Sequence, residues 1–312
     1  MHLQSREAMK LGILVLALSA CWHSRGPEPA RWRDSTKPAV ELLPAGAWLV
    51  VSLDIDTSQS ASQRAAEAKA RAGVVDNGKG GCQMPTNHAA FAVYDHERYG
   101  FLGRGVFQPD AMLDCLAKGY ANQEGTEHST IAGHDVLVTK KADAFGFLVS
   151  DDGVFVAATP SIIERMLATP FEPITNDRTL GPLIARARAG GEVWAAARFP
   201  HDAPYIADVL DVVGVKLSGH VAALVGAIHF TPPFHISLDL ELERVGDATL
   251  LASALERRKH ELVALDPNLA SVVEAIAIAS DGTRVRLTGQ FAKIDWLQTL
   301  QALLAAVARF KS

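Results

Sequence analysis

The sequence predicts an α+β fold: antiparallel sheets with helices packed on one face, arranged as two similar repeats. Apolar segments of strand length are joined in pairs by short polar turns such as Asp151-Asp152-Gly153, which is typical of antiparallel hairpins. The segment 235–243 alternates polar and apolar residues without interruption, which indicates one buried and one solvated face. The same order of elements then recurs in both halves of the chain.

The first α+β unit is expected over residues 42–168. Its strand segments are short apolar runs bounded by polar turns, and its helical segments are longer and rich in helix-forming residues. Pro109 suits the first turn of a helix. In order, we expect a strand at 47–54, a helix at 60–72, strands at 89–94 and 100–107, a helix at 109–119, strands at 134–140, 145–150 and 154–158, and a helix at 161–167.

The second unit is expected over residues 192–312, after a connection at 169–191 whose start is rich in proline and has no hydrophobic period. In order, we expect a strand at 192–198, a helix at 203–213, strands at 220–230 and 234–243, a helix at 247–264, strands at 273–280 and 283–291, and a helix at 293–310. Both halves therefore begin with a strand and a helix and end with a hairpin and a helix. This repetition predicts an internal duplication.

The N-terminus has the layout of a secretory signal over residues 1–20. Arg6 and Lys10 precede a short apolar run, which is too short to span a bilayer. Leu18-Ser19-Ala20-Cys21 then resembles the bacterial lipobox. The resemblance implies cleavage before Cys21 and acylation of that residue by chains of the palmitate type, which would anchor the protein to a membrane. The alternatives are an ordinary secretory signal followed by a coincidental cysteine, and a cytosolic protein with an apolar start.

Residues 21–41 are polar and lack a hydrophobic period, so we expect a flexible tether. Trp22 follows the cysteine where an aspartate would resemble an inner-membrane retention signal. We therefore expect an exported lipoprotein that faces the periplasm or the cell surface, with the outer membrane favoured over the inner.

Composition and charge limit the partners. The 312 residues are 48% hydrophobic and 21% charged, which is typical of a folded globular chain. A net charge of −5 leaves no basic surplus to neutralise phosphates, so we expect no nucleic-acid partner.

Cys82 and Cys115 remain after the lipid-bearing cysteine, and export would place them in an oxidising compartment. They can form one disulfide. Free buried thiols are an alternative, and so is a nucleophilic Cys115. Asp114 and the apolar neighbours of Cys115 would raise its thiol pKa, which disfavours the nucleophile.

The arrangement resembles a group of exported bacterial proteins that is common among myxobacterial lipoproteins and has no assigned activity. The shared features are the lipobox, the strand opening Pro44-Ala45-Gly46-Ala47, and a cysteine in the segment Met112-Leu113-Asp114-Cys115-Leu116. The resemblance covers residues 18–170 well and the rest loosely. It supports the architecture and the Cys82–Cys115 disulfide, and it implies no mechanism.

The search for local motifs yields no catalytic, cofactor-binding or metal-binding residue. The pairs His229/His235 and His128/His134 lie near turns, but neither has the further ligands that a zinc site needs. Asp95-His96-Glu97 and Asp151-Asp152-Gly153 are interpreted as hairpin turns. No Gly-x-Ser-x-Gly or phosphate-binding glycine motif occurs in the chain.

The expected function is that of a lipid-anchored, non-catalytic envelope protein that binds a protein or another envelope partner and needs no cofactor. Two alternatives stay open. One is a carrier of an apolar ligand in a cavity between sheet and helices. The other is an enzyme whose site is assembled from residues far apart in the sequence.

Overall fold

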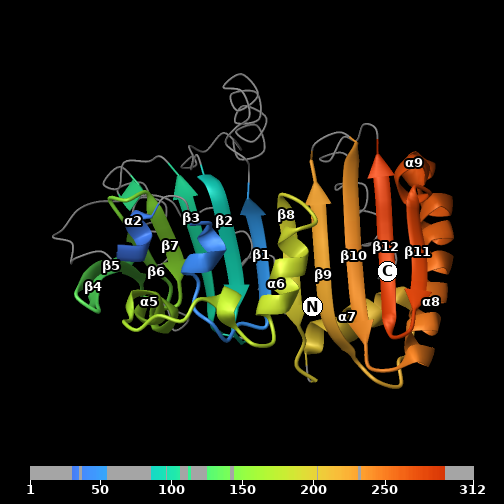
Figure 1. Ribbon diagram of the computed structural model, residues 1–312, viewed down its shortest axis with the longest axis horizontal. Coiled ribbons are helices and arrows are strands. Elements are labelled where there is room, and N and C mark those ends of the chain that lie inside the picture. The colour runs from blue at the N-terminus through green and yellow to red at the C-terminus, as the bar shows by residue number, and fades with distance from the viewer. Residues whose placement is uncertain are drawn as a thin grey trace. The chain divides into compact units, whose positions relative to one another are not determined.

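The computed structural model describes residues 30–34, 37–54, 86–95, 97–105, 112–113, 125–140, 144–201, 203–230 and 233–291 (Figure 1). The signal segment, the expected helices at 60–72 and 293–310, and most of the one at 109–119 lie outside these residues. The chain divides into two compact units, Met1–Asp177 and Arg178–Ser312. Each combines helices with an antiparallel sheet, as the α+β prediction requires.

In the first unit the strands follow the order β1-β2-β3-β7-β6-β5-β4, and each neighbouring pair is antiparallel. The strands are β1 (Leu49–Asp54), β2 (Thr86–Val93), β3 (Tyr99–Gly105), β4 (Thr126–Ile131), β5 (His134–Thr139), β6 (Gly146–Val149) and β7 (Val154–Ala158). The helices are α2 (Ala30–Arg33), the 3₁₀ helix η1 (Ala39–Leu42), α5 (Pro160–Leu167) and the 3₁₀ helix η2 (Ile174–Asn176).

The core of this unit is densest around β6 and β7, where every residue is buried. Helix α5 packs on the sheet through buried Ile162, Ile163 and Met166. A Cβ atom at Gly100 would lie 3.1 Å from both Ile162 and Met166, so the small residue lets the helix approach the sheet closely. Continuous apolar sequence in β6 and β7 is therefore explained by burial on both faces.

The end of the expected tether is folded onto the first sheet. Trp32, Ala39 and Val40 are fully buried, and the 3₁₀ helix η1 lies against β2 and β3. The guanidinium of buried Arg104 donates to the backbone oxygen of Trp32 at 2.6 Å. The tether prediction over 21–41 thus does not hold for this part. Charged residues around Trp32 make the segment look solvated, although its apolar side chains cover the sheet.

In the second unit the strand order is β11-β12-β10-β9-β8, again antiparallel at every pair. The strands are β8 (Val193–Arg198), β9 (Val221–His229), β10 (Phe234–Leu242), β11 (Ile276–Asp281) and β12 (Arg284–Phe291). The helices are α6 (Gly181–Arg188), α7 (Pro204–Val213), α8 (Val245–Leu265), the 3₁₀ helix η3 (Pro267–Leu269) and α9 (Ala270–Val273).

Helices of the second unit lie on both faces of its sheet, which differs from the expected single face. Arg186 of α6 pairs with Asp239 and Glu241 of β10, whereas the buried residues of α8 pack with Leu240 from the same strand. Adjacent strand residues point to opposite faces, so α6 and α8 cover opposite faces. In Figure 1, α6 lies in front of β8 and beside β9, the two strands that it contacts. This helix occupies part of the expected connection at 169–191.

Across the described ranges, no helix is both long and apolar enough to cross a membrane.

Candidate functional site

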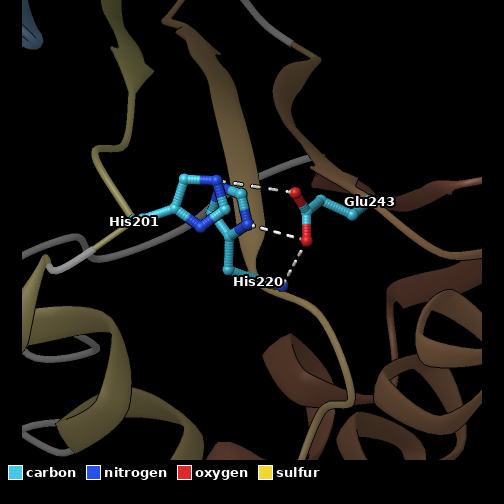
Figure 2. A group of neighbouring side chains, drawn as sticks. All are labelled: His201, His220 and Glu243. Atoms are coloured by element: carbon cyan, nitrogen blue, oxygen red, sulfur yellow. Dashed lines mark hydrogen bonds and ion pairs between the residues drawn. The ribbon is translucent and has the colours of Figure 1, made fainter.

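Three side chains of the second unit meet at one end of its sheet (Figure 2). His201 lies in the turn between β8 and α7, His220 directly precedes β9, and Glu243 directly follows β10. The hairpin register pairs Val221 with Leu242 after a bulge, so the two residues beyond that pair face each other. We call these three residues the His–Glu cluster. It lies entirely within the second unit.

The distances in the His–Glu cluster are short. Nδ1 of His220 lies 2.9 Å from Oε2 of Glu243, and Nε2 of His201 lies 3.7 Å from Oε1 of the same carboxylate. The centroids of the two imidazole rings are 3.8 Å apart. One ligand atom from each of the three residues lies within 4.8 Å of the other two. In the part of the chain that the structure describes, no other group of three or more histidine, cysteine or carboxylate residues meets this spacing.

The backbone around His220 is fixed by the buried carboxylate of Asp247. Its oxygens accept hydrogen bonds from the backbone of Ser218 at 2.9 Å and of Gly219 at 2.7 Å. These hydrogen bonds lower the pKa of Asp247 and keep it ionised. A Cβ at position 219 would lie 2.9 Å from Oε2 of Glu243, so a larger residue there would displace the Glu243 carboxylate from its present position. The loop is therefore built to bring His220 against Glu243.

The two histidines of the His–Glu cluster stabilise the charged form of Glu243. The His220 side chain, its backbone N–H and the charge of His201 lower the pKa of Glu243, so the carboxylate is ionised at neutral pH. Nδ1 of His220 is closed off from solvent and is not aligned for a hydrogen bond. His201 is 79% exposed, which leaves the cluster open to solvent on that side.

A second feature is a network of charges on the sheet face covered in part by α6. Two carboxylates of β10 alternate with three guanidiniums from α6 and β12, and we call this set the arginine ladder: Arg186, Asp239, Glu241, Arg284 and Arg286. Register places Asp239 opposite Arg286 and Glu241 opposite Arg284. Asp239 accepts from Nε of Arg286 at 2.8 Å, and Glu241 accepts from Nη1 of Arg186 at 2.6 Å.

The carboxylates of the arginine ladder lie beneath the cations. The Asp239 side chain is 17% exposed, against 54% for Arg286. Burial alone would raise the pKa of Asp239, but the hydrogen bond and charge of Arg286, with the charges of Arg284 and Arg186, outweigh burial and lower it. Asp239 in turn raises the pKa of Arg286. The guanidiniums are thus held in fixed positions at the surface.

The residues predicted from sequence fall into two groups. Cys21, Cys82 and Cys115 lie outside the described residues, so the lipidation and disulfide predictions stay predictions. His229 and His235 do face each other across the β9–β10 hairpin, with ring centroids 6.5 Å apart. Nδ1 of His229 lies 2.9 Å from Oε2 of Glu192.

His128 and His134 lie on opposite faces of the first sheet and therefore cannot share a metal. In the β4–β5 hairpin His128 pairs with Leu137, and His134 pairs with Ile131. Residues 128 and 131 of one strand point to opposite faces because their separation is odd. His128 contacts Asp135 at 3.2 Å, and burial lowers the pKa of His134. These two histidines have separate structural roles.

One arrangement in the first unit contains the residue types of a hydrolase triad. His88 contacts Asp54 through Nδ1 at 3.2 Å, and Ser52 is buried beside them. The Ser52 hydroxyl, however, donates to the backbone oxygen of Ala89 at 3.0 Å. Its second contact is with the Asp54 carboxylate, at 3.5 Å, whereas the serine of a hydrolase triad contacts the histidine. These contacts fit a structural role.

Comparisons of the chain with family models, with curated proteins and with solved structures gave no match. The site must therefore be interpreted from its own residues. Sequence reasoning missed the His–Glu cluster because its members are 19 and 23 residues apart and form no local motif. The usable signal was the β9–β10 hairpin, because the expected strands at 220–230 and 234–243 already place His220 and Glu243 at its open end.

Proposed function

We propose that this chain is an exported, lipid-anchored and non-catalytic protein, and that its second unit binds an envelope partner through the arginine ladder. The main support for this proposal is the arrangement of the arginine ladder. The side chains of Arg286, Arg284 and Arg186 are 54%, 41% and 38% exposed, although Nε of Arg284 is buried, and the carboxylates below them fix their positions. Arginine is favoured in protein interfaces because its planar group offers several donors and stacks on other surfaces.

The surroundings of the ladder support a binding surface. Ser237, Thr288 and Gln290 share its face and are exposed, and the neighbouring Ala277 of edge strand β11 is exposed as well. Small and polar side chains let a partner approach the sheet closely. Because the guanidiniums are already ordered, a partner would lose little side-chain entropy on binding them. The bound partner would therefore contact a preorganised polar surface.

The anchor is proposed from the lipobox. Acylation of Cys21 would hold the protein at a membrane and so raise the effective concentration of a partner in the same membrane. This part is tested by fractionation. The wild-type chain should be recovered with membranes and release acyl chains on hydrolysis. The Cys21→Ser variant should appear in the soluble fraction and release no acyl groups. Recovery of both the wild type and the variant in the soluble fraction would refute the anchor.

The binding surface is tested by photo-crosslinking in cells. A photoreactive residue is placed at Thr288, beside the arginine ladder, or at Leu250, which is 53% exposed on α8. One envelope partner should be captured from position 288 and not from 250. The Arg286→Gln change should abolish this capture, whereas Arg257→Gln, at an exposed position of α8, should not. Equal capture from both positions would refute the ladder as the binding surface.

We further propose that the two units arose by duplication, as the sequence order suggests. In the first unit the β1-β2-β3 meander is extended by β7, which pairs with β3 and continues to β6. In the second unit β8-β9-β10 is extended by β12, which pairs with β10 and continues to β11. Both closing hairpins turn at Asp-Gly. An experimental structure in which these two five-strand sets do not superpose would refute the proposal.

A further inference from the structure

We propose that the His–Glu cluster binds a divalent first-row transition-metal ion of the zinc class. This inference is independent of the proposed partner binding. Its donors are two imidazole nitrogens and one carboxylate oxygen, a set that suits zinc and its neighbours and not the hard ions Mg²⁺ and Ca²⁺, which prefer oxygen donors. The site is assembled from three separate segments of the second unit (Figure 2).

The distances fit one ion between the three side chains. Zinc binds imidazole nitrogen and carboxylate oxygen at about 2.0–2.2 Å, so ligand atoms around it are separated by about 3.3 Å in tetrahedral geometry. The two nitrogen–oxygen distances in the cluster are 2.9 Å and 3.7 Å, on either side of this value. Small rotations of His201 and Glu243 would therefore be enough to enclose the ion. Both side chains are exposed enough to make them.

The electrostatics favour a shared cation over an ion pair alone. The two imidazole rings lie 3.8 Å apart, and two imidazolium ions at that distance would repel each other. A metal ion binds imidazole in its neutral form and a carboxylate oxygen at the same time, so it would hold the three side chains together without that repulsion. The solvent-shielded Nδ1 of His220, which is not aligned for a hydrogen bond, would then have a ligand role.

The supporting residues hold two of the three ligands before any ion arrives. The backbone N–H of Glu243 donates to the backbone oxygen of His220 at 3.2 Å. Asp247 fixes Ser218 and Gly219 on the other side of His220. The third ligand, His201, lies in a turn closed by the hydrogen bond from Ala203 N to Pro200 O. Such outer contacts orient metal ligands in proteins, and their loss commonly lowers affinity by about 10–100-fold.

Three protein ligands leave at least one coordination position for a further donor. The exposure of His201 places that position toward solvent. Sites with this ligand count keep an exchangeable water or accept a ligand from outside. The bound ion would therefore be accessible to small molecules and to side chains of another protein.

The test uses the purified full-length chain and Zn²⁺ alone, with affinity measured by competition against a chelator. One Zn²⁺ per chain should bind, and an excess of Mg²⁺ or Ca²⁺ should not displace it. X-ray absorption at the zinc edge should show nitrogen and oxygen neighbours, including imidazole. A first shell containing sulfur would assign the ion to cysteine and overturn the proposal.

The variants separate ligation from folding. His201→Ala removes an exposed side chain, so it should leave the fold intact and reduce Zn²⁺ affinity at least about tenfold. The matched control is His235→Ala, which removes an exposed histidine from the other end of the same hairpin, close to His229 and Glu192. Its affinity should equal that of the wild type. An unchanged affinity in His201→Ala, or an equal loss in both variants, would overturn the proposal.

Discussion

The two sheets differ in how many of their faces are buried. In the first unit, each residue of strands β6 and β7 is buried, including the aromatic rings of Phe147 and Phe155. In the second unit, β10 alternates between exposed and half-buried residues over its first half, and β12 has exposed positions at Arg286, Thr288 and Gln290. The β6–β7 and β10–β12 pairs are both antiparallel, so strand direction does not cause the difference in burial. A continuous run of apolar residues indicates burial on both faces of a strand, and an alternating pattern indicates burial on one face.

The comparison indicates where binding features can be placed. A strand buried on both faces has no solvated side chain to use, and its substitutions act on stability. A strand with one open face can carry charged residues such as Asp239 and Glu241 while its other face packs against α8. The arginine ladder accordingly lies in the second unit.

Core truncation should affect the first unit more strongly. Phe155→Ala removes a ring that is 1% exposed and should lower the free energy of unfolding by about 3–5 kcal/mol. Leu238→Ala in β10 removes a half-buried side chain and should cost about 1–2 kcal/mol. Hydrogen exchange measured by mass spectrometry at increasing urea concentrations shows in which unit each variant has lost free energy of unfolding. Equal losses would show that the burial contrast has no energetic consequence.

Reduction should also affect one unit only, because all three cysteines precede the boundary at Asp177. If Cys82 and Cys115 are joined as predicted, the bond closes a loop of about 34 residues and contributes about 4 kcal/mol in the chain-entropy model. A reductant should therefore lower the stability of the first unit and leave the second unchanged. The Cys82→Ser, Cys115→Ser double variant is the control, since reductant should not affect it. A free-thiol count of two in the oxidised wild type would contradict the disulfide.

The two Asp-Gly turns provide a matched pair. Gly153 and Gly282 both have positive φ, of 72° and 58°. A Cβ at Gly153 would also lie 2.5 Å from the backbone oxygen of Gly105. A Cβ at Gly282 would have no neighbouring atom within 4 Å among the described residues. Gly282→Ala should therefore cost about 1–2 kcal/mol for the backbone conformation alone, and Gly153→Ala about 2–4 kcal/mol. Thermal unfolding of the two variants side by side measures the difference, and the reverse order would contradict it.

The smallest expected effect is a pH dependence of the first unit. Burial lowers the pKa of His134 in the folded state, so the unfolded chain binds a proton more readily. The stability that depends on neutral His134 is therefore complete above its unfolded pKa of about 6.5 and is lost as the pH falls through and below that value. The His134→Gln variant should lose less stability between pH 7 and pH 5 than the wild type. Chemical denaturation at both pH values checks this, and parallel losses would contradict it.

Much of the fold follows from local pattern. The alternating segment of β10, the turn at Asp151–Gly153 and helix α5 were each predicted close to their observed bounds, because burial of one or both faces leaves a periodic or continuous apolar pattern. Strand β4 could not be predicted from the sequence, because it is a largely exposed edge strand without a run of apolar residues. Helix α6 was not predicted, because it follows directly on a segment rich in proline and without a hydrophobic period.

The candidate site was predictable only in part. No local spacing links His201 to Glu243, since their proximity depends on the turn after β8 and on the bulge at the end of β10. The arginine ladder likewise depends on the β10–β12 pairing, which joins residues more than 40 positions apart. Long-range register of this kind is set by the packing of the whole sheet. A single sequence therefore shows which residues lie on a solvated face and leaves their partners undetermined.

The burial of Trp32 has a consequence for the distance between the protein and a membrane. With lipid on Cys21, as proposed, buried Trp32 follows the anchor by only 11 residues. A fully extended segment of that length reaches about 35–40 Å, and a flexible one averages about 18 Å. The folded body would then be confined to a thin layer above the lipid headgroups. A partner embedded in the same membrane would lie within its range, whereas one across a wide periplasm would not.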